Sequence, residues 1–190
     1  MLSHMASKPH TQNRPNVHHI ELNLQEISQL FNTMDPSPFR EKDLDHDAEE
    51  FIVSWAREFP LDEPVVLIVH LGVVSPEQEP QPMIEGAIHH YFAYRVELNR
   101  LELRHLMQDG LRFLLIGLVF LATCLTMSRI LVGEGAGTFS TIARESLAIG
   151  GWVAMWRPME IYLYDWWPLR RRGRILKKLS GMAVEVREQK

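Results

Sequence analysis

The 190-residue chain contains a single cysteine, Cys124, and this scarcity excludes several kinds of chemistry. One cysteine cannot form a disulfide within the chain, a CxxC redox pair or a zinc site built from several thiolates. The nucleophile elbow, the phosphate-binding loop, the kinase motifs and the dinucleotide-binding fingerprint are also missing from the sequence. We therefore expect a protein that is not an enzyme and that holds no cofactor.

Metal-ligating residues are present, but their spacing does not favour a metal site. The side chains of the adjacent pairs His18–His19 and His89–His90 diverge on a strand or a helix. Asp43, Asp45 and Asp47 have the spacing that opens a calcium-binding loop, but the glycine and the glutamate that complete this motif are missing. A helix cap formed by Asp45 or Asp47 explains the acidic run better, so we predict no metal site.

A long apolar run contrasts with the polar remainder of the chain. It extends over the 22 residues Leu111–Val132 and carries no charge between Arg112 and Arg129. As a helix it would be roughly 33 Å long, which is enough to cross a bilayer core of about 30 Å. The two arginines can extend to the head groups. We predict a transmembrane helix at 111–132; the alternative is a helix buried inside a soluble domain.

A second apolar segment follows after a short connection. Residues 133–140 contain no lysine or arginine and begin with the glycine-rich sequence GEGAG, which predicts a turn. Residues 141–165 are predicted to form a second transmembrane helix, with a bend near Pro158. Two spans joined in this way form a helical hairpin.

Basic residues lie on one side of this predicted hairpin. Arg95, Arg100 and Arg104 precede the first span, and a dense basic group follows the second span. By the positive-inside rule, both chain ends are then cytoplasmic. We expect the basic group to contact the anionic head groups of membrane lipids, and we expect no nucleic-acid partner. Its members are Arg170, Arg171, Arg172, Arg174, Lys177 and Lys178.

The part of the chain before the apolar run is acidic. Up to Gly110 the net charge is -10, from 8 Lys and Arg against 18 Asp and Glu, whereas the remainder carries +6. Apolar patterns predict strands at 17–24 and 64–71, with helical segments between them. Two strands form only a marginal sheet. Either a further strand is hidden in the sequence, or another subunit or a partner completes the sheet edge.

The predicted fold is an α+β cytoplasmic domain, a small sheet of about two strands with helices, joined by a long continuous helix to a transmembrane α-helical hairpin. The predicted division of the chain is a disordered tail at 1–16, the cytoplasmic domain at 17–82, a juxtamembrane helix at 83–110, spans at 111–132 and 141–165 with an external loop at 133–140, and a basic cytoplasmic tail at 166–190.

Two spacings predict how the helices pack. In the second span, Ser146, Gly150 and Ala154 recur at every fourth residue, which lets another helix approach closely. The partner is either the first span of the same chain or a second copy. In the juxtamembrane helix, a four-three spacing predicts a packing seam formed by Ala87, Tyr91, Tyr94, Leu98, Leu101 and His105.

Three charged residues form a candidate intramembrane polar cluster. Arg157 and Glu160 are three residues apart, so they can pair on a helix, and Asp165 lies further along the same segment. Ionisable residues at membrane depth are functional candidates. If the surrounding tryptophans mark the interface instead, the cluster ties down the bend at Pro158.

Three stretches, at 30–60, 90–122 and 150–171, carry a resemblance, and WRPMEIYLYDWWP is its most specific part. Together they resemble a family of small uncharacterised bacterial inner-membrane proteins with two spans. The resemblance implies a place in the bacterial inner membrane and no known activity.

These observations favour a non-enzymatic assembly or adaptor protein that presents an acidic cytoplasmic domain. We expect it to be a homo-oligomer, with a further protein partner as an additional expectation. The alternative is an oligomeric subunit that moves or senses an ion or a lipid through Arg157, Glu160 and Asp165. An enzyme acting on lipid head groups is disfavoured, because no nucleophile and base are paired in the sequence.

Overall fold

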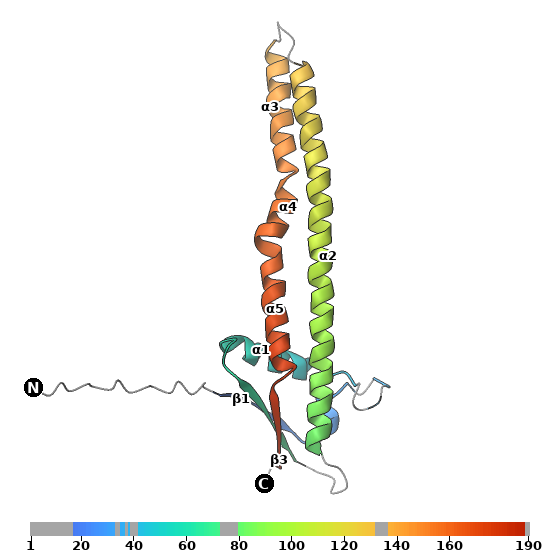
Figure 1. Ribbon diagram of the computed structural model, residues 1–190, viewed down its shortest axis with the longest axis vertical. Coiled ribbons are helices and arrows are strands. Elements are labelled where there is room, and N and C mark those ends of the chain that lie inside the picture. Colours follow the sequence, from blue (N-terminus) through green and yellow to red (C-terminus); the bar gives the residue numbers. More distant parts are fainter. Residues whose placement is uncertain are drawn as a thin grey trace, which may run out of the picture. The chain divides into compact units, whose positions relative to one another are not determined.

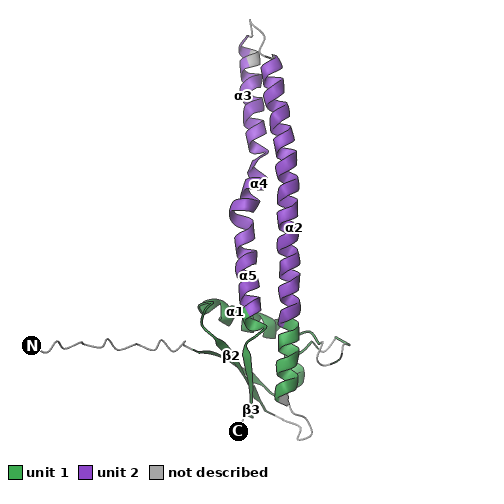
Figure 2. Cartoon of the chain, viewed as in Figure 1, with its two compact units in different colours: residues 1–91, 178–190 green, residues 92–177 purple. Residues whose placement is uncertain are grey.

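The structure is a computed structural model that describes residues 17–32, 35–36, 38, 42–72, 80–131 and 137–188. The predicted tail at 1–16 and most of the predicted loop at 133–140 lie outside these residues. The chain divides into two compact units, coloured separately in Figure 2. Unit 1 consists of Met1–Tyr91 and Lys178–Lys190, and unit 2 consists of Phe92–Lys177. One helix, α2 (Pro80–Leu131), contributes to both.

Unit 1 contains a three-stranded parallel sheet, so the prediction of about two strands is wrong. The strands β1 (His18–Leu24), β2 (Val65–Leu71) and β3 (Ala183–Glu188) lie in the order β1-β2-β3. The two predicted strands are present, and the third comes from the segment that was assigned as a basic tail (Figure 1, red). A third strand is physically expected, because two strands alone would be marginal in water.

One face of the sheet forms part of the core of unit 1. The register places Ile20, Leu67 and Val184 in one row across the three strands, and all three are buried. The opposite face carries polar residues around the buried Ile68. There Nε2 of His70 lies 3.6 Å from Oε2 of Glu21.

Helix α1 (His46–Glu58) connects β1 to β2 and begins with a side-chain cap. Oδ1 of Asp45 accepts a hydrogen bond of 3.0 Å from the backbone N–H of Asp47. This confirms the capping interpretation of the acidic run. The helix buries Ala48, Ile52, Val53 and Ala56. Before it, the segment predicted as helical around Ile27–Leu30 forms only a single 3-10 turn, η1.

Helix α2 is 52 residues long, and its buried side differs from the predicted seam. Ala87 and Tyr91 are buried as predicted, but Tyr94 and Leu101 are exposed, and Asn99 is buried instead. The seam prediction is therefore wrong beyond Tyr91. Of its remaining members, Leu98 is half-buried and His105 is exposed.

The chain returns along α2 as an interrupted series of helices, and not as the single span predicted at 141–165. The elements are α3 (Thr138–Val153), α4 (Trp156–Glu160), the π-helical turn η3 (Ile161–Asp165) and α5 (Trp166–Leu179). Pro158 has no N–H to donate to the carbonyl of Ala154, so a regular helix cannot pass through this point. The predicted transmembrane hairpin of two regular spans is thus corrected. Among the described residues, α2 is the one helix that is long and apolar enough to cross a membrane.

Candidate functional site

The most unusual surface of the molecule is the outer side of unit 2, where large apolar side chains face outward. On α2, Ile116, Val119 and Ile130 are 64%, 68% and 71% exposed. Within the most apolar stretch of this helix, only 17% of the residues are buried. A core helix of a soluble protein would bury such side chains, at about 25 cal/mol of stabilisation per Å² removed from water. The apolar stretch of α2 therefore has the exposure that a membrane-spanning helix has.

The returning segment extends this apolar surface, as α2 and α3 to α5 run side by side in Figure 2. Its outward residues also include several aromatic rings. The exposed apolar residues of the returning segment are Ile142, Ile149, Trp152, Val153, Trp156, Met159, Tyr162, Leu163, Tyr164 and Trp167. Many exposed large apolar side chains on both segments are typical of a membrane or protein contact.

Glycines allow the two helical segments of unit 2 to approach closely. A Cβ atom on Gly117 would lie 3.1 Å from the carbonyl oxygen of Ala154, and one on Gly151 would lie 2.8 Å from Cδ1 of Leu121. One on Gly110 would lie 2.9 Å from Cγ2 of Ile161. The sequence analysis missed these packing positions. The signal was available, because Gly110, Gly117 and the buried Cys124 recur at every seventh residue of α2.

We call the contact formed at Gly110, Gly117 and Gly151 the glycine seam. The predicted packing stripe of Ser146, Gly150 and Ala154 lies beside this glycine seam and only partly in it. Ser146 and Gly150 are exposed, and no atom of the described residues lies within 4 Å of a Cβ atom placed on Gly150. Ala154 is half-buried, with its carbonyl oxygen facing Gly117. The sequence left two partners open, the first span of the same chain and a second copy. The helix of the same chain, α2, is contacted mainly by Gly151, the residue next to Gly150. Whether a second copy uses Ser146 and Gly150 stays a prediction.

The predicted polar cluster is brought together around one guanidinium group. Nη1 of Arg157 lies 2.9 Å from Oε2 of Glu160 and 3.2 Å from Oδ2 of Asp165. In a regular α-helix, residues eight positions apart are more than two turns apart along the axis. The π-helical turn η3 lies on the path from Arg157 to Asp165. It has more residues per turn than an α-helix, so Asp165 lies closer to Arg157 along the axis and on the same side of the helix. Arg157 can therefore bind both carboxylates at once.

The level of this cluster along α2 follows from the packing on either side of it. Ala154 and Met155 pack at Gly117, and Ile161 and Tyr162 pack at Gly110. Arg157 is thus held alongside the beginning of the apolar run of α2. Arg112 lies at the same part of α2 and is paired with Asp109 at 2.9 Å. The polar cluster accordingly lies at the margin of the apolar surface and not at its middle.

The basic group predicted to contact lipids is divided by the structure. Nη1 of Arg172 pairs with Oε2 of Glu102 at 3.9 Å, and Cζ of Arg170 lies 5.6 Å from the ring centroid of Trp166. Lys178 belongs to unit 1, where its Nζ donates a hydrogen bond of 2.6 Å to the carbonyl oxygen of Pro60. Burial lowers the pKa of Lys178, and the nearby charges of Glu63 and Asp62 oppose this shift. Lys178 is therefore occupied inside its own unit.

Unit 1 carries a second candidate surface, an aromatic row on α1; the sequence pattern places Phe51, Trp55 and Phe59 on one side of a helix but does not show that this side is exposed. Phe51 and Trp55 are 39% and 43% exposed, with ring centroids 6.1 Å apart. The row continues through Phe59, 6.4 Å from Trp55, to His18, whose ring stacks on Phe59 at 4.2 Å. We call these four residues the α1 aromatic row. His18 is also hydrogen-bonded to Glu63, which fixes the end of the row.

The described residues contain no group of three or more histidine, cysteine or acidic side chains that could hold a metal ion. Comparison with family models, with curated proteins and with solved structures finds no match to this chain. The relation to bacterial two-span inner-membrane proteins therefore rests on the resemblance of the sequence and stays a prediction.

Proposed function

We propose that the protein is an integral membrane protein anchored by unit 2. The outward apolar side chains of α2 carry this proposal, because water is a poor solvent for them and lipid tails are not. The apolar residues of α3 enter the bilayer beside α2, in contact where Gly151 faces Leu121 and Cys124. The interrupted segment around Arg157 then lies at the cytoplasmic interface, where tryptophan and tyrosine are favoured.

The proposed orientation places unit 1 and both chain ends in the cytoplasm. Positive charges support it, since α5 holds six arginines and lysines and the connection between α2 and α3 holds none. Unit 1 is also the acidic part of the chain, which is compatible with an aqueous compartment. The resemblance of the sequence supports the bacterial inner membrane as the location.

We further propose that unit 1 is a non-enzymatic adaptor that binds a protein partner through the α1 aromatic row. Exposed tryptophan and phenylalanine are enriched in protein interfaces and are otherwise unfavourable in water. Carboxylates accompany the row on α1 and after it, at Glu50, Glu58, Asp62 and Glu63. A partner with basic residues around an apolar contact would suit this surface. Assembly of several copies remains part of the proposal.

Ion or lipid movement through Arg157, Glu160 and Asp165 is the less supported alternative. Arg157 is shared between both carboxylates, so neither acid is held ready for a passing ion. The packing at Gly110 and Gly117 is compatible with an anchoring role at the interface.

Membrane insertion is tested by alkaline extraction and by labelling of engineered cysteines in a Cys124→Ala background. We expect the protein to resist extraction. A Thr138→Cys variant should react with an impermeant reagent added outside intact cells, and a Ser180→Cys variant should react only after lysis. Release by alkali would contradict the anchor, and labelling of both positions from one side without lysis would contradict the orientation.

The adaptor role is tested with a photocrosslinking amino acid at Trp55 and, as a matched control, at Arg57. Both positions are exposed on α1, but only Trp55 belongs to the aromatic row. We expect a defined adduct from Trp55 that Phe51→Ala weakens, and none from Arg57. Equal adducts from both positions would contradict a specific surface. Native mass spectrometry in mild detergent tests the oligomer, and a monomer at all concentrations would exclude it.

A further inference from the structure

The first turns of α5 hold an arginine in a fixed position beside an aromatic ring. Trp166 is half-buried, and its Nε1 donates a hydrogen bond of 2.8 Å to the carbonyl oxygen of Tyr162, which fixes the indole. Cζ of Arg170 lies 5.6 Å from the centroid of that ring, a cation-π distance. The guanidinium is therefore preorganised one turn beyond the exposed aromatic rings that mark the margin of the apolar surface.

Three further exposed side chains share one side of α5 with Arg170. Trp167, Arg170, Arg171 and Arg174 follow the spacing i, i+3, i+4, i+7, which places them on one helix face. All four are exposed. The indole of Trp167 lies 6.5 Å from that of Trp166. The N-terminal end of this face is therefore aromatic, and the remainder is cationic.

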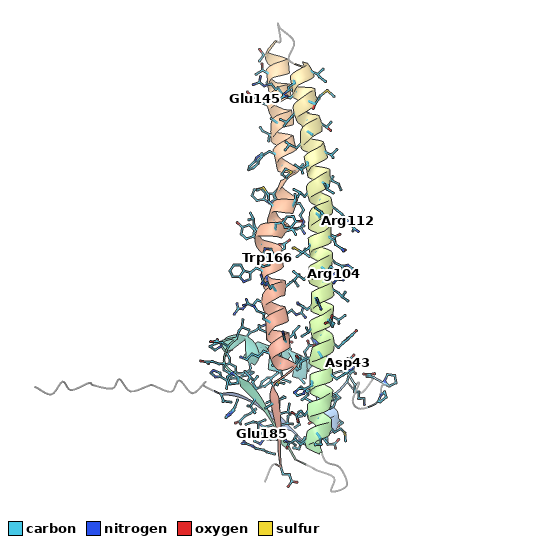
Figure 3. The ribbon with its side chains drawn as sticks, in the orientation of Figure 1. Asp43, Arg104, Arg112, Glu145, Trp166 and Glu185 are labelled. Carbon is cyan, nitrogen blue, oxygen red and sulfur yellow. The ribbon has the colours of Figure 1, made fainter. Side chains whose placement is uncertain are left out.

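The direction of α5 turns these arginines toward the membrane margin. Side chains on a helix lean toward its N-terminus. The N-terminus of α5 is its end nearest the exposed aromatic rings, and Arg170 indeed lies over Trp166, four residues earlier. The side chains of α2 lean away from its apolar run, because they lean toward the N-terminus of the helix and the apolar run lies toward its C-terminus. Arg104 lies on α2 at about the level of Trp166 (Figure 3), and by the same rule its side chain is expected to lean away from the apolar run.

These arginines also keep their charge available. Among the described residues, Arg172 pairs with Glu102 and Arg157 pairs with two carboxylates, whereas Arg170, Arg171 and Arg174 form no ion pair. No acidic residue occurs anywhere in α5. Three uncompensated guanidinium groups favour an anion, and a guanidinium binds the oxygens of a phosphate with two parallel hydrogen bonds.

We propose that the α5 face formed by Trp167, Arg170, Arg171 and Arg174 is a binding site for an anionic phospholipid. The arginines bind the phosphate group, and the indoles of Trp166 and Trp167 contact the glycerol region and the upper acyl chains. A zwitterionic lipid fits less well, because its ammonium group would meet cations and no acceptor. This inference rests on the proposed membrane anchor and adds to it the class of lipid and its site.

The test is native mass spectrometry of the full chain in mild detergent, titrated with phosphatidylglycerol or with phosphatidylethanolamine of the same acyl chains. We expect preferential binding of phosphatidylglycerol, weakened about tenfold by Arg170→Gln, since one charge-assisted hydrogen-bond pair is lost. Arg170→Lys should recover only part of the affinity, because lysine keeps the charge without the planar fork. Arg104→Gln is the matched control, and it should change the affinity less than about twofold.

Three results would overturn the inference. Equal retention of both lipids would remove the preference for an anionic head group. Equal losses for Arg170→Gln and Arg104→Gln would show a general effect of charge and no site on α5. Full competition by free glycerol phosphate would show a site for soluble phosphates. A protein that is extracted by alkali fails the anchor proposal itself, whereas a protein that stays in the membrane without lipid preference fails this inference alone.

Discussion

Units 1 and 2 distribute their side chains in opposite ways. Unit 1 buries large aliphatic residues such as Ile20, Leu67 and Leu71, and its outward sheet face is polar. Along the apolar run of α2, unit 2 instead buries Gly117, Cys124 and Ser128 and turns leucine and isoleucine outward, and its large buried side chains, Ile161, Ile175 and Leu176, lie outside that run. Apolar content alone would not separate them. The direction in which the apolar side chains point agrees with the proposed membrane anchor, in which water surrounds unit 1 and lipid surrounds unit 2.

The α1 aromatic row is the exception within unit 1. Its outward Phe51 and Trp55 resemble the surface of unit 2 more than the rest of their own unit. These two exposed aromatic rings are the observation on which the proposed contact with a protein partner rests.

The comparison predicts that the same kind of truncation has different consequences in the two units. Leu67→Ala should lower the free energy of unfolding of unit 1 by about 2–5 kcal/mol, because it leaves a cavity at a fully buried position. Val119→Ala should cost less than about 1 kcal/mol, since lipid tails replace the lost contacts. Hydrogen exchange of the amides of β2 and of α2 measures both. A loss at Val119 as large as that at Leu67 would show that α2 is buried in a protein core.

A charge on the outer side of α2 should prevent insertion. Val119→Asp should cost about 2.5–3.5 kcal/mol at the middle of a span and lower the fraction of protein in the membrane pellet. His105→Asp introduces the same group on an exposed position of α2 outside the apolar run, and it should leave that fraction unchanged. If the two variants partition alike, the outward apolar surface of α2 does not contact lipid.

The glycine seam of unit 2 can be tested with one methyl group. Gly117→Ala should destabilise unit 2 by about 1–3 kcal/mol, because the new Cβ would lie 3.1 Å from both the carbonyl oxygen of Ala154 and Sδ of Met155. Gly150→Ala meets no atom within 4 Å, and alanine is the better helix former by about 1 kcal/mol, so it should stabilise. Thermal melting in detergent compares the two. A destabilised Gly150→Ala would instead place a second helix against the Ser146, Gly150 and Ala154 stripe.

The elements with a strong local pattern were predictable from the sequence. The strand β2 is a continuous apolar run bounded by proline and glycine, and α1 begins at an aspartate cap, so both were assigned within a few residues of their bounds. The strand β3 was missed because AVEVRE has three apolar residues and follows a basic segment. It is an edge strand of a parallel sheet, and its partner β2 lies far away in sequence.

The candidate site was predictable in its members and not in its geometry. Arg157 and Glu160 could be paired from their spacing, but the inclusion of Asp165 depends on the π-helical turn, which has no spacing rule of its own. The buried Asn99 was missed because it lies outside the four-three spacing that defined the predicted seam. Its Nδ2 donates a hydrogen bond of 3.0 Å to the carbonyl oxygen of Leu169, a contact that no local sequence pattern indicates.

The smallest expected effect concerns Lys178, a partly buried cation of unit 1. Burial lowers its pKa in the folded protein below the ordinary value of 10.5. The unfolded chain therefore binds this proton more tightly. Its contribution disfavours folding at pH values below the folded pKa, and the cost is relieved as the pH rises from that value through 10.5.

Relative to Lys178→Met, the wild-type unit 1 should thus gain stability as the pH rises from the lowered pKa of Lys178 in the folded protein through 10.5, as hydrogen exchange of the β2 amides would show. The gain should become larger in Glu63→Gln, because the carboxylate of Glu63 raises the pKa of Lys178 and so opposes the effect of burial. A difference between wild type and Lys178→Met that falls with pH would mean that the acidic neighbours outweigh the burial. The partial burial of Lys178 would then lower the stability of unit 1 no more than the paired Arg157 lowers that of unit 2.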